Sequence, residues 1–185
     1  MSCVGRESRF HGIACVPPIR HCDDVAESWF LRIDGIEGES KDVSHKDEID
    51  VLSWSWGITN LDSVVGSGGG GAGKAAFQDF HFVSRISKAS PMLFLACASG
   101  THHKTAALSG VRTAGKSKSA EFLTYKLSDV VVTSDQHSGS DDDVAIEQFS
   151  LNYGEIEVSY TQQLASGKFA KPVRAGFDVT MGKGF

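Results

Sequence analysis

The sequence has no long apolar run: every uninterrupted apolar stretch falls short of the ~18 residues that a membrane-spanning helix needs. Its first residues contain no apolar stretch of about 7–15 residues, so neither a Sec-type signal peptide nor membrane insertion is predicted. Cysteine is scarce, and the 4 present are too few for a disulfide scaffold. Positive charge is not in excess, because 18 Lys and Arg oppose 23 Asp and Glu, and a nucleic-acid partner is therefore disfavoured.

What the chain does contain fits one globular domain with a sizeable core, since 41% of its 185 residues are hydrophobic and 22% are charged. Residues 1–28 differ from the rest, because they follow neither the period of a strand nor that of a helix. The cysteines and histidines of this segment match no compact zinc-finger spacing. We therefore predict a disordered N-terminal extension over 1–28 and a folded domain over 29–185.

The stretch HKDEIDVLSWSWGI, residues 45–58, predicts the central strand of that domain. Trp54 and Trp56 share one face of an extended chain, and small residues alternate with them on the other face. The apolar register slips by one residue between Val51 and Leu52. Such a slip turns every side chain to the other face unless a bulge absorbs it, so a bulge near Val51 and a bent strand are predicted.

In two later segments the apolar residues also change parity, that is, they switch between odd-numbered and even-numbered positions. EFLTYKLSDVVVTS changes parity between Leu127 and Val130, and EQFSLNYGEIEVSYT changes at Gly154, where a glycine within a strand indicates a bulge. The polar residues 135–143 between them are predicted as a loop. Because flat sheets need no such devices, the repeated breaks favour a closed or strongly coiled antiparallel barrel.

One helix is predicted, over the apolar run that follows Ser90. Ser90 suits the N-cap, Pro91 the first helical position and Gly100 the left-handed C-cap. Residues 92–98 are apolar all round, so we expect a largely buried helix, packed on the strand over 75–86, which has apolar residues on both faces. The predicted fold class is therefore mainly β: an antiparallel β-barrel with one flanking α-helix.

A glycine-rich run, GGGGAGKA at residues 68–75, resembles a phosphate-binding loop. It fails at Ala75, which offers no hydroxyl to Mg²⁺. It also leads into a predicted strand, whereas a phosphate-binding loop opens a helix whose N–H groups hold the phosphate. The run is interpreted as a flexible connection.

The histidines and acidic residues form no recognisable metal pattern. His102 and His103 are adjacent and point apart, and His81 stands by itself, so all three are interpreted as solvated. The acidic residues 141–143 lack the spacing of a calcium loop. No Gly-x-Ser-x-Gly elbow positions a nucleophile. We therefore expect no enzyme activity, no catalytic or metal-binding residues and no cofactor.

Six blocks of the chain, in order, resemble the haemolysin-coregulated protein (Hcp) family, the inner-tube proteins of bacterial type VI secretion systems. The blocks are FLRIDGIEGESKDVSHKDEIDVLSWSWGI, GGGGAGKAAFQDFHF, KASPMLFLACASGTH, LSDVVVTS, EQFSLNYGEIEVSYTQQ and GKFAKPVRAGFDV. Together they extend over about residues 29–182, and six ordered blocks are far more specific than a lone glycine motif. Residues 1–28 depart from the family, whose members usually lack such a segment.

The resemblance implies a β-barrel with one helix that assembles into homohexameric rings. Such rings stack head to tail into a tube, which a contractile sheath propels and a spike caps. The implied partners are further copies of the chain, the sheath and spike proteins, and small effector proteins in the ring lumen. The resemblance also implies that the protein leaves the bacterial cytoplasm through the type VI apparatus, is extracellular after secretion, and has no chemistry of its own.

Two groups of residues are candidates for these contacts. The small face of the central strand would line the lumen: Ser53, Ser55 and Gly57. The long charged loop before it would contact the next ring: Glu39, Lys41, Asp42, His45, Lys46, Asp47 and Glu48. Both surfaces also have simpler interpretations, as the solvent face of an antiparallel sheet and as a solvated loop.

Two other functions stay open at this point. One is a monomeric barrel that binds a small ligand in its mouth. The other is a nucleotide hydrolase that uses the loop Gly68–Lys74, which would lose its turnover in Lys74→Ala.

Overall fold

The structure is a computed structural model, and it describes residues 26–60, 75–113, 119–141, 143–164 and 169–185. Its elements in chain order are β1 (Ala26–Ile33), β2 (Ile49–Ser55), β3 (Ile58–Asn60), β4 (Ala75–Phe77), β5 (Phe80–Arg85), α1 (Ser90–Ser99), β6 (His102–Thr113), β7 (Ser119–Ser140), β8 (Asp143–Tyr160), β9 (Val173–Asp178) and β10 (Lys183–Gly184).

Parts of two predictions lie outside the described residues. These are most of the N-terminal extension, residues 1–25, and the glycine-rich run up to Lys74. β1 begins at Ala26, earlier than Trp29, where the folded domain was predicted to start. Residues 26–28 pair with Val111, Arg112 and Thr113 of β6, so they belong to the sheet.

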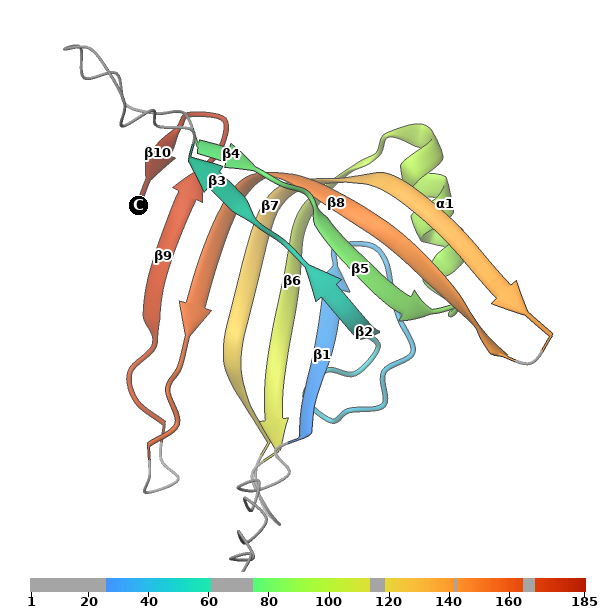
Figure 1. Cartoon of the computed structure of the whole chain (residues 1–185), viewed down its shortest axis with the longest axis horizontal. Helices are drawn as coiled ribbons and strands as arrows, with labels where there is room; N and C mark the ends of the chain where they lie inside the picture. The colour runs from blue at the N-terminus through green and yellow to red at the C-terminus, as the bar shows by residue number, and fades with distance from the viewer. Residues whose placement is uncertain (1–25, 61–74, 114–118, 142, 165–168) are drawn as a thin grey trace, which may run out of the picture.

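Six antiparallel strands close a barrel in the order β8-β5-β2-β1-β6-β7, with β7 pairing back onto β8. Figure 1 shows these strands curving around a common interior, while β9 and β10 extend the sheet beyond β8. β3 and β4 form a separate two-stranded ribbon. The predicted class, an antiparallel β-barrel with one helix, is confirmed.

The barrel interior is filled by apolar side chains that alternate along the strands. Those almost fully buried include Leu31, Ile49, Phe80, Phe82, Leu108, Leu127, Phe149 and Leu151. Trp54 in β2 and Trp56 just after it both pack against this core, and Trp56 stacks on Phe80 with ring centroids 5.3 Å apart. The prediction that the two tryptophans share the apolar face is confirmed.

β2 carries the bulge that the sequence predicted. Its pairing with β5 shifts register between Val51 and Ser53, so Leu52 is the extra residue and its side chain is exposed. Val51 before the bulge and Trp54 after it therefore both face the interior. The bulge reconciles the apolar pattern with one continuous core.

β7 and β8 change parity where the sequence indicated, but not through a bulge at Gly154. The register is the same on both sides of this level, with Ser128 opposite Glu155 and Val130 opposite Tyr153. Asp129, between the two pairs, has a positive φ of 51°. The predicted bulge at Gly154 is therefore wrong, because both strands kink together and neither inserts an extra residue.

The single strand predicted over 75–86 is two strands that belong to different sheets. β4 pairs with β3, whereas β5 pairs with β2 and β8. Between them the Gln78 N–H donates to the Gly57 carbonyl at 3.0 Å, which redirects the chain. The helix was expected on the outer face of this segment, and that expectation is wrong: α1 packs on β7.

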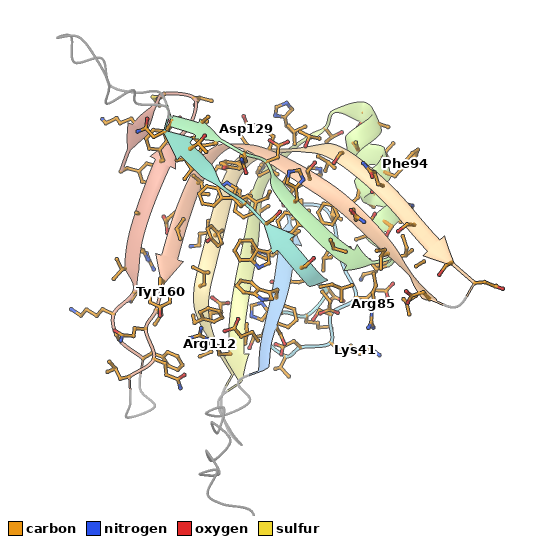
Figure 2. All side chains as sticks on the ribbon, in the orientation of Figure 1. Lys41, Arg85, Phe94, Arg112, Asp129 and Tyr160 are labelled. Atoms are coloured by element: carbon orange, nitrogen blue, oxygen red, sulfur yellow. The ribbon has the colours of Figure 1, made fainter. Side chains whose placement is uncertain are left out.

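α1 ends as predicted but differs at its start and in its burial. Gly100 is the left-handed C-cap, with φ 63°, but the N-cap is Ala89 and the Ser90 hydroxyl bonds elsewhere. Leu93 and Ala96 pack into the core. The expectation of a largely buried helix is wrong, because the barrel covers one side of the helix and leaves the other to solvent. Met92, Phe94 and Leu95 are exposed. Figure 2 shows Phe94 on the side of α1 that faces away from the barrel.

Residues 135–143 are not a loop, as predicted, but the tip of a long hairpin. β7 continues to Ser140 and β8 starts at Asp143, with Asp135 opposite Phe149 and Ser140 opposite Asp143. We call residues 134–140 and 143–150 the β7–β8 arm. The arm lies beside α1 in Figure 1. Its β7 side, residues 134–140, contains only polar residues and glycine, so it lacks the apolar alternation from which a strand is predicted.

Candidate functional site

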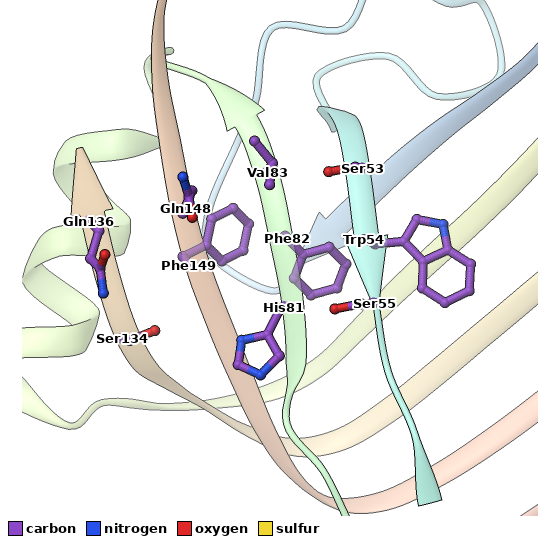
Figure 3. A pocket seen from close by; sticks show the side chains of 10 residues that line it. All are labelled: Ser53, Trp54, Ser55, His81, Phe82, Val83, Ser134, Gln136, Gln148 and Phe149. Carbon is purple, nitrogen blue, oxygen red and sulfur yellow. The ribbon is translucent and has the colours of Figure 1, made fainter. Parts of the chain in front are cut away.

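A polar groove of about 260 Å³ lies on the outer face of the barrel (Figure 3). Its walls include Ser53 and Ser55 from β2, His81 from β5, Gln136 from β7 and Gln148 from β8. The register explains this gathering, since neighbouring strands place paired residues on the same face. The groove therefore crosses four strands, and the apolar residues Trp54, Phe82, Val83 and Phe149 line it beside the polar ones. We call it the polar groove after its exposed polar side chains.

The structure brings only part of the predicted lumen set together. Ser53 and Ser55 are exposed and lie in the groove, as their alternation with Trp54 predicted. Gly57 lies beyond the end of β2, where a Cβ would approach the side-chain oxygen of Gln78 to 2.9 Å. Gly57 thus lies beside Gln78, a neighbour that the sequence pattern did not reveal.

Three residues of this groove were not identified from the sequence: Ser134, Gln136 and Gln148. Gln136 and Gln148 are directly opposite each other on β7 and β8. The signal that could have found them is the period-2 alternation around Phe149, which places Gln148 on the face opposite the core.

The charged loop before β2 is held by its own backbone. The Gly38 N–H donates to the Asp47 carbonyl at 2.7 Å, and the Ser40 N–H donates to the Glu48 carbonyl at 3.0 Å. A Cβ on Gly38 would overlap the Glu48 carbonyl, so glycine is required at this crossing. We call residues 37–48 the β1–β2 loop.

His45 and Glu48, two of the seven candidate stacking residues, are largely inside this loop. The His45 ring stacks on Phe30 with centroids 4.6 Å apart and contacts Glu48 Oε2 through Nδ1 at 2.9 Å. His45 is only 4% exposed. The other candidates are exposed or half-buried: Glu39, Lys41, Asp42, Lys46 and Asp47.

Lys88, which precedes α1, ties the β1–β2 loop to the barrel. Its ammonium lies 3.2 Å from Glu37 and 3.5 Å from Asp47, and its backbone N–H donates to Glu39 at 2.9 Å. The hydrogen bond to Glu37 raises the pKa of Lys88, with Asp47 acting in the same direction. The loop is therefore a structured surface and not a freely solvated one.

His102 and His103 point apart, as predicted. His102 Nδ1 lies 2.8 Å from Asp129 Oδ1 on β7, whereas His103 Nδ1 contacts the Asp34 carbonyl at 2.8 Å on the other side. His81 opens into the polar groove. The structure brings no two of these three histidines onto one ligand position.

A buried carboxylate lies at the base of the β7–β8 arm. Glu147 is fully buried; its Oε2 accepts from the Ser90 hydroxyl at 2.9 Å, and His137 Nε2 lies 3.1 Å from its Oε1. Burial raises the pKa of Glu147, while the Ser90 and His137 hydrogen bonds oppose that rise. Asp135 lies beside them, with its Oδ1 3.3 Å from His137 Nε2.

Sequence reasoning missed this cluster entirely. Asp135 and His137 fell in the predicted loop, and Glu147 fell at the start of the following strand. Only the hairpin register, which sets His137 directly opposite Glu147, brings them together. In the described part of the chain these are the side chains whose nitrogen and oxygen atoms lie close enough, all within 4.8 Å, to share a metal ion.

No helix in the described ranges is both long and apolar enough to cross a membrane.

Known proteins similar to this chain agree with one another. The model of the family described as "Type VI secretion system effector, Hcp" matches residues 30–160. Over 157 residues the chain is 41% identical to "Protein hcp1" of Pseudomonas aeruginosa, which covers 84% of this chain and 96% of that protein.

Solved structures give the same result. The crystal structure of Hcp1 from Salmonella typhimurium is 34% identical with a TM-score of 0.71, covering 86% of this chain and 99% of the other. The crystal structure of a type VI secretion system effector from Yersinia pestis is 33% identical with a TM-score of 0.66, covering 81% and 98%.

Proposed function

The chain belongs to the Hcp family of type VI secretion proteins, and from this premise we propose that it is an inner-tube subunit. In this proposal, copies of the chain form hexameric rings that stack into a tube, are secreted, and carry small effector proteins in the ring lumen. The proposal rests mainly on family membership. In addition, the barrel interior is filled by side chains, so two exposed surfaces on the outside of the barrel are available for contacts with other molecules.

The first of these surfaces is the exposed side of α1. Phe94 is 61% exposed and Leu95 55% exposed, although both are large apolar residues. A contact with a neighbouring copy would remove this area from water and so favour association. A head-to-tail contact of this kind closes into a ring when the rotation between copies permits.

The second surface is the polar groove, which we assign to the lumen. Ser53 and Ser55 on β2 form one edge of the groove, Gln136 on β7 forms the other, and His81 and Gln148 lie between them. Such a surface can hydrogen-bond to many partners without a deep apolar pocket, as a carrier of different effectors requires. Gly57 is not part of this assignment.

Ring stacking is assigned to the outer edge of the β1–β2 loop. Val43 at its tip is 98% exposed, between the charged residues Asp42 and Lys46. The backbone bonds of the loop and its tie to Lys88 hold this edge in one shape, which lowers the entropic cost of contact. His45 and Glu48 support the loop from within, and the exposed members make the contact.

The proposal describes a mechanical role without chemistry of its own. The expected partners are further copies of the chain, the sheath and spike of the secretion machine, and effectors in the lumen. The expected location is the bacterial cytoplasm before firing and the extracellular medium after it. Contacts between rings are expected to be polar and modest in area, because such interfaces release.

The rival, a monomeric barrel with a ligand in its mouth, is disfavoured by the filled interior. Phe80, Phe82 and Phe149 are among the buried side chains that occupy it. These residues leave the described barrel packed as a core and not hollow as a ligand-binding barrel is.

Size-exclusion chromatography with light scattering, followed by electron microscopy, tests the proposal. We expect a mass about six times the 19.8 kDa of the chain and annuli with a central hole. A single species of monomer mass at every concentration, with no annuli, would contradict it and favour the rival.

A further inference from the structure

Three side chains of the β7–β8 arm converge on one point that the tube function does not use. Asp135 and His137 are two residues apart on β7 and so share a face, and Glu147 is directly opposite His137 on β8. Gln136 and Gln148 face the other way, into the polar groove. The convergence is therefore separate from the proposed lumen.

Two of the three distances within this cluster match those between the ligands of a metal ion, and all three atoms lie within 4.8 Å of one another. His137 Nε2 lies 3.1 Å from Glu147 Oε1 and 3.3 Å from Asp135 Oδ1. Ligands bound tetrahedrally at about 2.0–2.1 Å are separated from one another by about 3.3 Å. One ion could thus take all three atoms with small adjustments.

Asp135 supplies an independent observation. Its side chain is only 5% exposed, and within the described residues its buried Oδ1 makes no hydrogen bond, although His137 Nε2 lies 3.3 Å from it. A buried carboxylate oxygen left in this way is costly unless something compensates its charge. A cation bound between Asp135 and Glu147 would do so.

Glu147 is already oriented for this role by groups behind it. Its Oε2 accepts from Ser90 at 2.9 Å and lies 3.5 Å from the Ser84 hydroxyl, which leaves Oε1 to face His137. Hydrogen bonds that fix the outer oxygen of a ligating carboxylate are typical of metal sites. His137 is 46% exposed, so an ion and a water ligand could enter from solvent.

We propose that Asp135, His137 and Glu147 form a binding site for a divalent transition-metal ion, of which Zn²⁺ is the best match. One imidazole and two carboxylates are ligands that Zn²⁺ accepts, and an imidazole disfavours Mg²⁺ and Ca²⁺ relative to it. The bound ion joins β7 to β8 within the β7–β8 arm and, through Glu147 and Ser90, fixes the arm to α1. The inference concerns a single copy of the chain and does not depend on ring formation.

Calorimetric titration of the chelator-treated full-length protein with Zn²⁺ tests the site. We expect one saturable binding component that disappears in His137→Ala. In Glu147→Gln and in Asp135→Asn the affinity for Zn²⁺ should fall by about tenfold or more, since loss of a group that only supports a ligand already costs about that much. Mg²⁺ should give no such component. Co²⁺ in place of Zn²⁺ should give visible absorption bands that are lost in the same variants.

His102→Ala is the matched control, because His102 also pairs with a carboxylate, Asp129, at 2.8 Å but belongs to no group of three possible metal ligands among the described residues. This variant should keep the binding component, and any Zn²⁺ held by the cysteines and histidines of residues 1–25 is the same in every variant. The site is refuted if His137→Ala binds Zn²⁺ as the unaltered protein does, or if His102→Ala loses the same component.

A second measurement keeps the test independent of folding defects. Zn²⁺ should raise the thermal midpoint of the unaltered protein and of His102→Ala, since a ligand bound only by the folded state stabilises it, but not that of His137→Ala. Equal shifts in all three proteins would mean that Zn²⁺ binds elsewhere and would overturn the proposal.

Discussion

Asp129 and Gly154 lie opposite each other on β7 and β8, at the level where the core-facing residues of both strands change parity. Asp129 has a φ of 51°, and a Cβ on Gly154 would lie 3.3 Å from the Asp129 Cβ. The two residues thus make a kink that crosses both strands at once. A side chain at position 154 would therefore be in tight contact with Asp129, whose backbone is already in the left-handed region.

The first prediction follows from this contact. Gly154→Ala should lower the free energy of unfolding by about 1 kcal/mol, because the new methyl group must push Asp129 aside. Urea denaturation measures the effect. Gly139→Ala is the control: its Cβ would make an ordinary contact of 3.5 Å with Ala145, so it should be neutral or stabilising by about 0.4–1 kcal/mol. Equal effects at the two glycines would contradict the paired kink.

The kink and the β2 bulge show what the sequence could reveal. A parity change is visible in one strand, so the bulge at Leu52 and the change near Gly154 were both predictable. Whether a bulge or a change in both strands accommodates the switch in parity depends on the partner strand. At Leu52 the partner keeps its parity and a bulge results, whereas Asp129 and Gly154 change together.

The errors have a common physical origin in contacts between distant segments. Residues 134–140 of the β7–β8 arm are all polar or glycine, so their strand structure follows from pairing with β8 and not from an apolar pattern of their own. α1 is apolar all round, but the side that the barrel covers depends on where the helix docks. The cluster of Asp135, His137 and Glu147 exists only through the hairpin register, and no local pattern encodes it.

The second prediction concerns alkaline pH. Burial raises the pKa of Tyr153 to about 12, with the charge of Asp79 adding to the rise and the Trp56 hydrogen bond opposing it. The unfolded chain has the ordinary tyrosine pKa of about 10 and so loses its proton first. Stability from this group is therefore complete below about pH 10 and is lost as the pH rises toward 12, by up to about 2–3 kcal/mol.

Free energies of unfolding measured from about pH 9 to 12 should fall less steeply in Tyr153→Phe than in the unaltered protein. Tyr160→Phe serves as the control, because Tyr160 is 42% exposed and should leave the slope unchanged. A slope that is the same in all three proteins would show that Tyr153 ionises as readily in the folded state as in the unfolded one.

The third prediction separates the two sides of α1. Phe94→Gln should leave the stability of one copy nearly unchanged, since Phe94 already faces solvent, but should raise the concentration needed for assembly. Leu93→Ala, one residue away and fully buried, should instead cost about 2–5 kcal/mol of stability. Light scattering and urea denaturation distinguish the two outcomes. Assembly of Phe94→Gln at unchanged concentration would remove α1 from the proposed contact.

The last prediction tests the lumen assignment at Ser55, whose side chain opens into the polar groove opposite His81. Ser55→Arg adds a positive charge and a long side chain to a groove of about 260 Å³, so it should impair retention of effectors while rings still form. Co-purification of effector with the rings measures retention, and light scattering measures ring mass.

Ser138→Arg is the matched control for this change, because Ser138 is an exposed strand serine on the β7–β8 arm and does not line the groove. It should alter neither readout. If Ser55→Arg abolished the rings themselves, Ser55 would belong to the contact between subunits and the groove would be an interface. If both readouts stayed normal, the groove would face solvent, as the outer face of an antiparallel sheet commonly does.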